Sequence, residues 1–175
     1  MGGIDLPQLD RQPSDATKAL VEEFIRFRGG FVSSFGQCEF LFGRLISRLT
    51  ANERISFVAV EFPFRVESRL QAVIQAFENE SALNPYKEQA FRLASRLKAE
   101  IDLRNFLVHG FAKFFAQEGC WRIRLCRPVK DNPWHESEMV IRIEEVPQHV
   151  SRMGLLTQES IYFLNDLNSA FELNF

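Results

Sequence analysis

Four polar side chains interrupt an otherwise apolar helical pattern just after the middle of this chain. Glu100 precedes Arg104 by four residues, Asn105 follows the arginine directly, and His109 lies four residues further on. An arginine can hold two oxygens of one anion, and a histidine can move protons near neutral pH. Together, these residue types suit chemistry on a phosphate group.

Helical geometry decides which of these side chains share a face. A helix turns by about 100° per residue, so Asn105 and His109 share one side and Glu100 and Arg104 share another. Arg104 and His109 lie about 140° apart on an ideal helix. A long arginine side chain, or a bend near Gly110, could still let both groups reach one anion.

The same residues also have a purely structural explanation. A histidine near a helix end often caps the helix or packs in the core, and a glutamate four residues before an arginine often makes only a modest ion pair. Both explanations stay open on residue spacing alone.

This arrangement resembles the motif of the HEPN superfamily, whose members are helical domains and in many cases ribonucleases. The motif has an arginine, usually followed by a polar residue, and a histidine after four to six residues, often with an acidic residue four positions before the arginine. Arg104, Asn105, His109 and Glu100 match it position by position. The resemblance also covers the order of long helices across most of the chain.

The resemblance implies metal-independent cleavage of RNA, in which the 2′-hydroxyl of the RNA attacks the adjacent phosphorus and no cofactor takes part. His109 would move the proton and Arg104 would clamp the phosphate. Asn105 would orient the histidine or the phosphate, and Glu100 would hold Arg104. The products would carry a 2′,3′-cyclic phosphate and a 5′-hydroxyl.

The resemblance also implies partners. Family members generally work as homodimers with two motifs facing one cleft, often as toxins of a toxin-antitoxin or phage-defence system. In the branch whose antitoxin is a small nucleotidyltransferase, a tyrosine that the antitoxin modifies stands two residues after the histidine, and here that residue is Phe111. RNA, a second copy and an antitoxin protein are therefore the expected partners, without that modification. The alternatives are a non-catalytic HEPN domain that binds a nucleotide or a protein partner, and a purely structural helical adaptor.

Composition limits the classes of function. A net charge of −2 and a pI near 6.0 argue against a protein that coats nucleic acid through bulk charge, so any contact with RNA must be local. Three cysteines without a C-x-x-C pair indicate neither a disulfide framework nor a zinc site. With no signal-like N-terminus and no long apolar run, we expect a soluble, cytoplasmic protein without a membrane segment.

Outside the motif, the apolar spacing predicts a mainly α fold. Helical periodicity extends over residues 17–50, 66–80, from Asn84-Pro85 into the central motif, and from Ser151 to the C-terminus. Ser14 or Asp15, Asn84 and Ser151 are the predicted helix caps. We expect a strap over residues 1–15 and then one domain, 16–175, an up-and-down bundle of four to five helices.

A β-hairpin is predicted before the last helix, at about residues 119–146. After Phe115 the apolar period changes from helical to alternating, and two alternating stretches flank the turn residues Asp131-Asn132-Pro133. Arg122, Arg124 and Arg142 lie on these stretches and could extend an RNA track. A charged face on such a ribbon is, however, often simply solvated.

Glycines repeat within the first predicted helix. Gly29, Gly36 and Gly43 recur at intervals of seven, although glycine disfavours an exposed helix interior by up to about 1 kcal/mol. Three explanations fit: close packing against another helix of the same chain, a subunit interface in which two copies approach closely, or a break of the helix at Gly29-Gly30.

Overall fold

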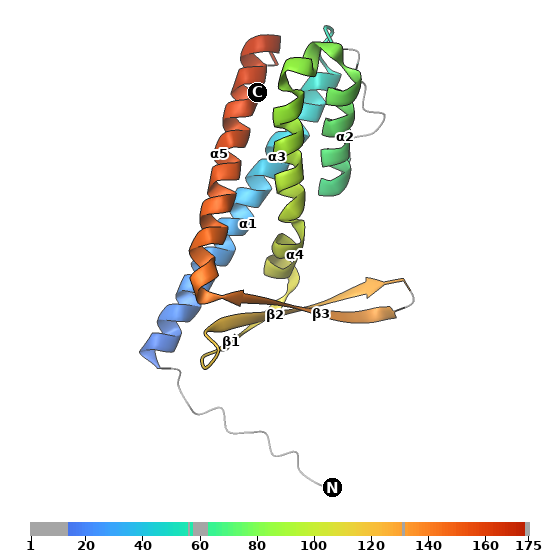
Figure 1. The fold of residues 1–175 in the computed structure, drawn as a ribbon. Helices are drawn as coiled ribbons and strands as arrows, with labels where there is room; N and C mark the ends of the chain where they lie inside the picture. Colours follow the sequence, from blue (N-terminus) through green and yellow to red (C-terminus); the bar gives the residue numbers. More distant parts are fainter. Residues whose placement is uncertain (1–13, 56, 58–62, 131, 174–175) are drawn as a thin grey trace.

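The computed structural model describes residues 14–55, 57, 63–130 and 132–173. It is a helical bundle with a small antiparallel sheet before the last helix (Figure 1), which confirms the predicted fold class. The helices are α1 (Asp15–Thr50), α2 (Val66–Asn79), α3 (Lys87–Ala99), α4 (Ile101–His109) and α5 (Val146–Phe171), and the strands are β1 (Phe111–Phe115), β2 (Cys120–Val129) and β3 (Asn132–Arg142). Short 3-10 helices cover Ser81–Tyr86 and Ile143–Glu145. All but the last two residues of the expected N-terminal strap lie outside the described residues.

Helix α1 is one continuous element of 36 residues that runs alongside α5 (Figure 1). Ser14 caps it, because its side-chain oxygen accepts a hydrogen bond from the Thr17 backbone N–H at 3.2 Å. Its apolar stripe is buried in the core through a row of phenylalanines: Phe24, Phe27, Phe31, Phe35 and Phe42.

Two other predicted caps are not used. Asn84 and Pro85 lie inside the 3-10 helix, and α3 begins after them at Lys87. Helix α5 begins at Val146 instead of near Ser151, with Pro147 in its first turn, where the missing proline N–H leaves no helical hydrogen bond unmade. The residues that precede α3 and α5 are Tyr86 and Glu145, and neither makes a side-chain capping hydrogen bond, so these two cap predictions were wrong.

The predicted hairpin is confirmed as β2 and β3, and β1 adds a third strand that the sequence pattern did not predict. The order is β1-β2-β3, all antiparallel. The inner face of the sheet packs on the bundle: the Trp121 ring stacks on Phe24 of α1 at 4.1 Å and lies 5.0 Å from Phe114 of β1, centroid to centroid. The sheet therefore closes the end of the bundle at which α4 ends (Figure 1).

Two of the three repeated glycines of α1 have open space beside them. A Cβ added at Gly29 or Gly36 would meet no heavy atom within 4 Å, whereas Gly43 is buried. Close packing within the chain therefore does not explain Gly29 and Gly36. In the part of the chain that the structure describes, no helix combines the length and the apolar character needed to cross a membrane.

Candidate functional site

The polar motif lies on α4, a short helix separated from α3 by a turn at Glu100. The Glu100 N–H donates to the Leu97 carbonyl at 3.1 Å, and the Glu100 carbonyl accepts from the Arg104 N–H at 2.9 Å. Helix α3 thus ends and α4 begins at this residue. The sequence had predicted one uninterrupted helix here, because the apolar spacing continues through the turn from Leu97 to Ile101.

Arg104 is half-buried between α4 and α1. Its Nη1 donates to Asn105 Oδ1 at 3.0 Å, and its guanidinium carbon lies 5.7 Å from the centroid of the buried Phe35 ring of α1. Within the described residues Arg104 forms no ion pair. Its position is therefore set by a neutral amide and an aromatic ring, and its charge is not neutralised by a neighbouring carboxylate.

His109 is the last residue of α4 and its side chain is exposed. Among the described residues its imidazole makes no hydrogen bond, ion pair or ring contact. The Val108 carbonyl at the end of α4 is capped by Arg28 of α1, whose Nη2 donates to it at 3.0 Å, and not by His109. The imidazole is therefore free to meet a ligand.

The structure brings some of the predicted site residues together and separates others. Arg104 and Asn105 are hydrogen-bonded, and Asn105 and His109 lie one turn apart on the same side of α4. Among the described residues, no hydrogen bond or ring contact joins Arg104 and His109. Arg28 is a cation of this site that sequence reasoning missed, because it is 80 residues away from Val108 and no motif marks it.

Glu100 does not hold Arg104. It is buried, and its carboxylate pairs with Arg152 of α5, with Oε1 2.5 Å from Nε and Oε2 2.9 Å from Nη2. The expected ion pair across one turn is absent among the described residues because the Glu100 side chain faces α5. The motif carboxylate thus fastens the α3–α4 turn to α5 and does not position the motif arginine.

The same contact reveals a second polar cluster, which sequence reasoning also missed. Arg152 Nη2 lies 3.0 Å from His149 Nδ1, and since arginine has no acceptor, Nδ1 accepts and the neutral ring carries its proton on Nε2. Burial and the nearby Arg152 lower the pKa of His149, against the opposing effect of Glu100 and Glu145. These residues line a pocket of about 450 Å³. The spacing of His149 and Arg152, three apart on one helix face, was the only signal in the sequence.

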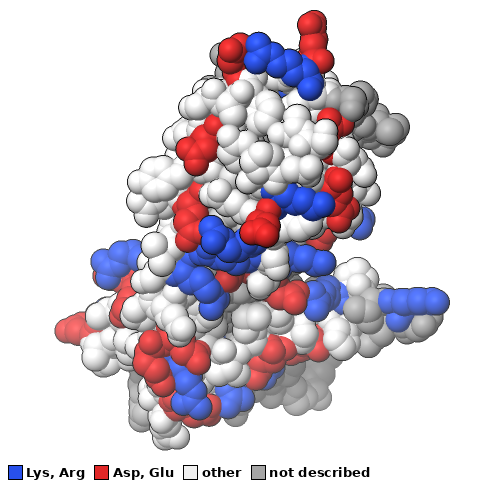
Figure 2. Space-filling model, turned by 45° about the horizontal axis from the view of Figure 1, so that its top comes forward, with Lys and Arg blue, Asp and Glu red and all other residues white. Residues whose placement is uncertain are grey.

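The three arginines predicted to extend an RNA track are largely paired. Arg122 contacts Glu118 at 2.6 Å and Glu138 at 3.5 Å, and Arg124 contacts Glu138 at 3.0 Å. Arg142 lies 3.9 Å from its neighbour Glu144. In Figure 2, acidic and basic side chains are interspersed over the face shown, with no wide basic surface. These pairs lower the charge available to attract RNA at long range.

In the part of the chain that the structure describes, no group of three or more His, Cys, Asp or Glu side chains is arranged to hold a metal ion. No protein-family model matches the chain, and comparison with curated proteins and with solved structures gives no significant match.

Proposed function

We propose that this protein is a HEPN-type, metal-independent endoribonuclease, of the kind found in toxin-antitoxin or phage-defence systems. The observation that carries the proposal is the exposed His109 imidazole, which no described residue engages, at the end of the short helix that also bears the charged, unpaired Arg104. A proton carrier that no described residue engages, on the same short helix as a cation whose charge no described carboxylate offsets, suits cleavage of a phosphodiester.

In this proposal each group has a distinct task. His109 moves a proton between the reacting oxygens and solvent as the RNA 2′-hydroxyl attacks phosphorus and the 5′-oxygen leaves. Arg104 opposes the charge that builds on the phosphate oxygens, and Asn105 orients the Arg104 guanidinium through their hydrogen bond. Arg28, whose guanidinium donates to the carbonyl of Val108, adds a second positive charge at the end of α4.

A second copy of the chain completes the site, because one histidine does not readily serve as base and acid in the same step. The open glycines of α1 are the observation in favour of a dimer, because Gly29 and Gly36 are exposed and have no heavy atom within 4 Å of their Cβ positions, which leaves room for a second backbone. The exposed Phe40, four residues after Gly36, extends the same surface. Two copies packed on this surface would bring their motifs near one groove.

The dimer has its own test in sedimentation velocity. We expect Gly36→Leu to weaken self-association, because it places a branched side chain where two backbones approach. Gly154→Leu is the matched control, since Gly154 of α5 is also exposed with no atom within 4 Å of its Cβ position. Unchanged association of Gly36→Leu would remove this surface from the proposal.

Cleavage is tested with purified protein and a defined single-stranded RNA, with products identified by mass spectrometry. We expect fragments ending in 2′,3′-cyclic phosphate and 5′-hydroxyl, and a rate about 10²- to 10⁴-fold lower for His109→Ala. His135→Ala, which alters an exposed histidine on β3, is the control and should cleave normally. Wild-type cleavage by His109→Ala would refute the assignment.

The second candidate is a non-catalytic HEPN domain that binds a nucleotide or a protein partner. The specific observation in its favour is the absence, among the described residues, of any hydrogen bond or ring contact between Arg104 and His109. This candidate predicts binding of a nucleotide that depends on Arg104, with no RNA cleavage by the wild-type protein and no growth arrest on induced expression.

A further inference from the structure

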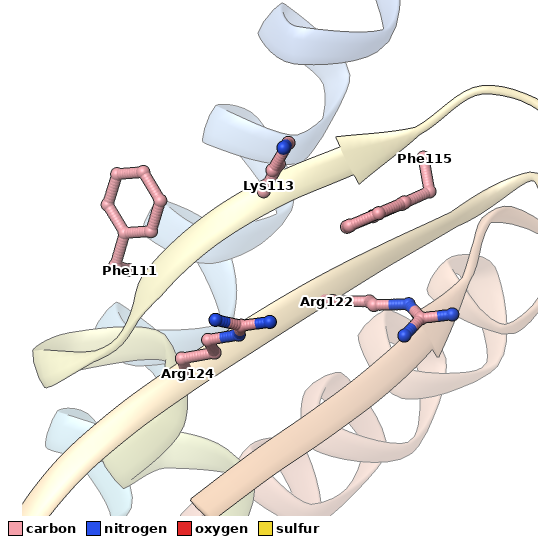
Figure 3. Close-up of a pocket in the computed structure, with 5 residues that line it drawn as sticks. All are labelled: Phe111, Lys113, Phe115, Arg122 and Arg124. Carbon is pink, nitrogen blue, oxygen red and sulfur yellow. The ribbon is translucent and has the colours of Figure 1, made fainter. Parts of the chain in front are cut away.

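The outer face of the sheet carries a row of aromatic and basic side chains. Phe111, Lys113 and Phe115 alternate along β1 and so point to one side, and the register places Arg124 opposite Phe111 and Arg122 opposite Lys113 on β2. These five residues line a pocket of about 250 Å³ (Figure 3). The pocket lies on the outer face of the sheet, and Trp121 packs on the bundle from the other face.

The aromatic rings give this pocket its main binding capacity. Phe111 is 73% exposed, so most of its side-chain surface is in contact with water. Figure 3 shows the Phe111 ring at one end of the β1 row and the Phe115 ring at the other. The Phe111 ring is open to a planar ligand, whereas the partly buried Phe115 ring has the Arg122 guanidinium 4.6 Å from its centroid.

The charges of the pocket are nearly balanced. Lys113 lies 5.3 Å from the Phe115 ring centroid and, within the described residues, pairs with no carboxylate. The two arginines pair with Glu118 in the turn between β1 and β2 and with Glu136 and Glu138 on β3. A duplex that binds mainly through many phosphates would gain little here. Stacking of a planar base, with Lys113 free to meet one phosphate, fits the pocket better.

We propose that this outer-sheet pocket binds an unpaired base of single-stranded RNA, stacked on Phe111, with a neighbouring phosphate on Lys113. The inference rests on the proposed ribonuclease function, because it makes RNA the ligand. Phe111 follows His109 by two residues, so their Cα atoms are at most about 7 Å apart. A base on Phe111 would therefore belong to a nucleotide close to the scissile phosphate, and the pocket would hold the strand in register for cleavage.

The test measures binding separately from cleavage. Each variant is made in a His109→Ala background, and its affinity for a fluorescent single-stranded RNA of about 12 nucleotides, and for the same RNA as a duplex, is measured by anisotropy. We expect Phe111→Ala to weaken single-strand binding by about 5- to 150-fold, the loss of one stacked base. Phe111→Trp should retain binding, since it keeps a stacking surface. Phe64→Ala, which removes another exposed phenylalanine, two residues before α2 begins, is the control and should not change single-strand binding.

The outcomes separate this inference from the proposed function. Reduced binding by Phe111→Ala, without His109-dependent cleavage by the wild-type protein, would keep the RNA pocket and refute the nuclease. His109-dependent cleavage with unchanged affinity in Phe111→Ala would keep the nuclease and refute the pocket. Equal losses for single-stranded and duplex RNA would also refute base stacking. If Phe111→Ala instead leaves RNA affinity unchanged and dissociates a dimer in sedimentation, the exposed ring serves a protein contact and the inference is overturned.

Discussion

The Glu100 carboxylate and the Arg152 guanidinium face each other in a two-point contact, at 2.5 Å and 2.9 Å, that joins the α3–α4 turn to α5. The two partners differ in their access to water: the Glu100 side chain is 6% exposed and that of Arg152 is 44% exposed. Removing Arg152 would leave the buried Glu100 carboxylate without a cation to offset its charge. Removing Glu100 would leave a guanidinium that is still partly hydrated, so the two changes should differ in their effect on stability.

The first prediction is that Arg152→Ala destabilises the fold more than Glu100→Ala. We expect a loss of about 2–4 kcal/mol in the free energy of unfolding for Arg152→Ala and about 1–2 kcal/mol for Glu100→Ala, measured by urea denaturation. Arg92→Ala, which breaks a longer and more exposed pair with Glu159, should cost less than about 1 kcal/mol. An equal or greater loss for Glu100→Ala would contradict this account of the pair.

The second prediction concerns Gly110, where α4 meets the sheet. A Cβ at this position would lie 2.5 Å from Ile123 Cγ2 and 2.5 Å from the Phe106 carbonyl oxygen, so we expect Gly110→Ala to cost about 1–3 kcal/mol of unfolding free energy through overpacking. Gly36→Ala is the opposite case, because nothing lies within 4 Å of its Cβ position and alanine favours helix by up to about 1 kcal/mol. Compared with the wild-type protein, Gly110→Ala should have a lower Tm in thermal unfolding, and Gly36→Ala an equal or higher Tm. The reverse order would mean that the contact between Gly110 and β2 has room for a methyl group.

The architecture followed from the sequence because its signals are local. The phenylalanine spacing of α1 and the alternation of β2 and β3 each arise within one segment, and both predictions were confirmed. Strand β1 was missed because Phe111–Phe115 has apolar residues on both faces and so shows no alternation.

The candidate site was less predictable, because its decisive contacts are long-range. The turn at Glu100 depends on Arg152, which is 52 residues away, and the helix end at His109 depends on Arg28, which is 80 residues away from Val108. Residue types and spacing identified the polar motif, but they paired Glu100 with the wrong arginine. Only the packing of α5 and α1 against α4 decides which cation each group meets.

The third prediction concerns pH. Burial and Arg152 lower the pKa of His149 in the folded state relative to its ordinary value near 6.5, so the unfolded chain binds its proton first as the pH falls. The stabilising effect of the neutral ring is therefore fully present above about pH 6.5 and is lost as the pH falls through the lowered pKa. We expect the free energy of unfolding to decrease over this acidic range, and His149→Gln to make the decrease smaller.

The control variant for this prediction is at His135, an exposed histidine on β3. His135→Gln should leave the slope of stability against pH as in the wild-type protein, measured by urea denaturation at several pH values. If the slope changes in His135→Gln and not in His149→Gln, then His149 is not the group that makes the fold sensitive to acid, and the prediction is wrong.

The fourth prediction separates the structural and electrostatic roles of Arg28. Its guanidinium satisfies the Val108 carbonyl at the end of α4 and also adds positive charge there, so Arg28→Met should remove both contributions while keeping an apolar stem. We expect a loss of about 1 kcal/mol in unfolding free energy from the hydrogen bond. RNA binding by the His109→Ala protein should weaken as well, with a smaller dependence on salt, because one fewer cation meets the phosphates. Arg28→Lys keeps the charge, so its RNA binding should show most of the salt dependence seen with Arg28, even if its unfolding free energy is lower. If both Arg28→Met and Arg28→Lys keep the full salt dependence of RNA binding, Arg28 acts only as a helix cap.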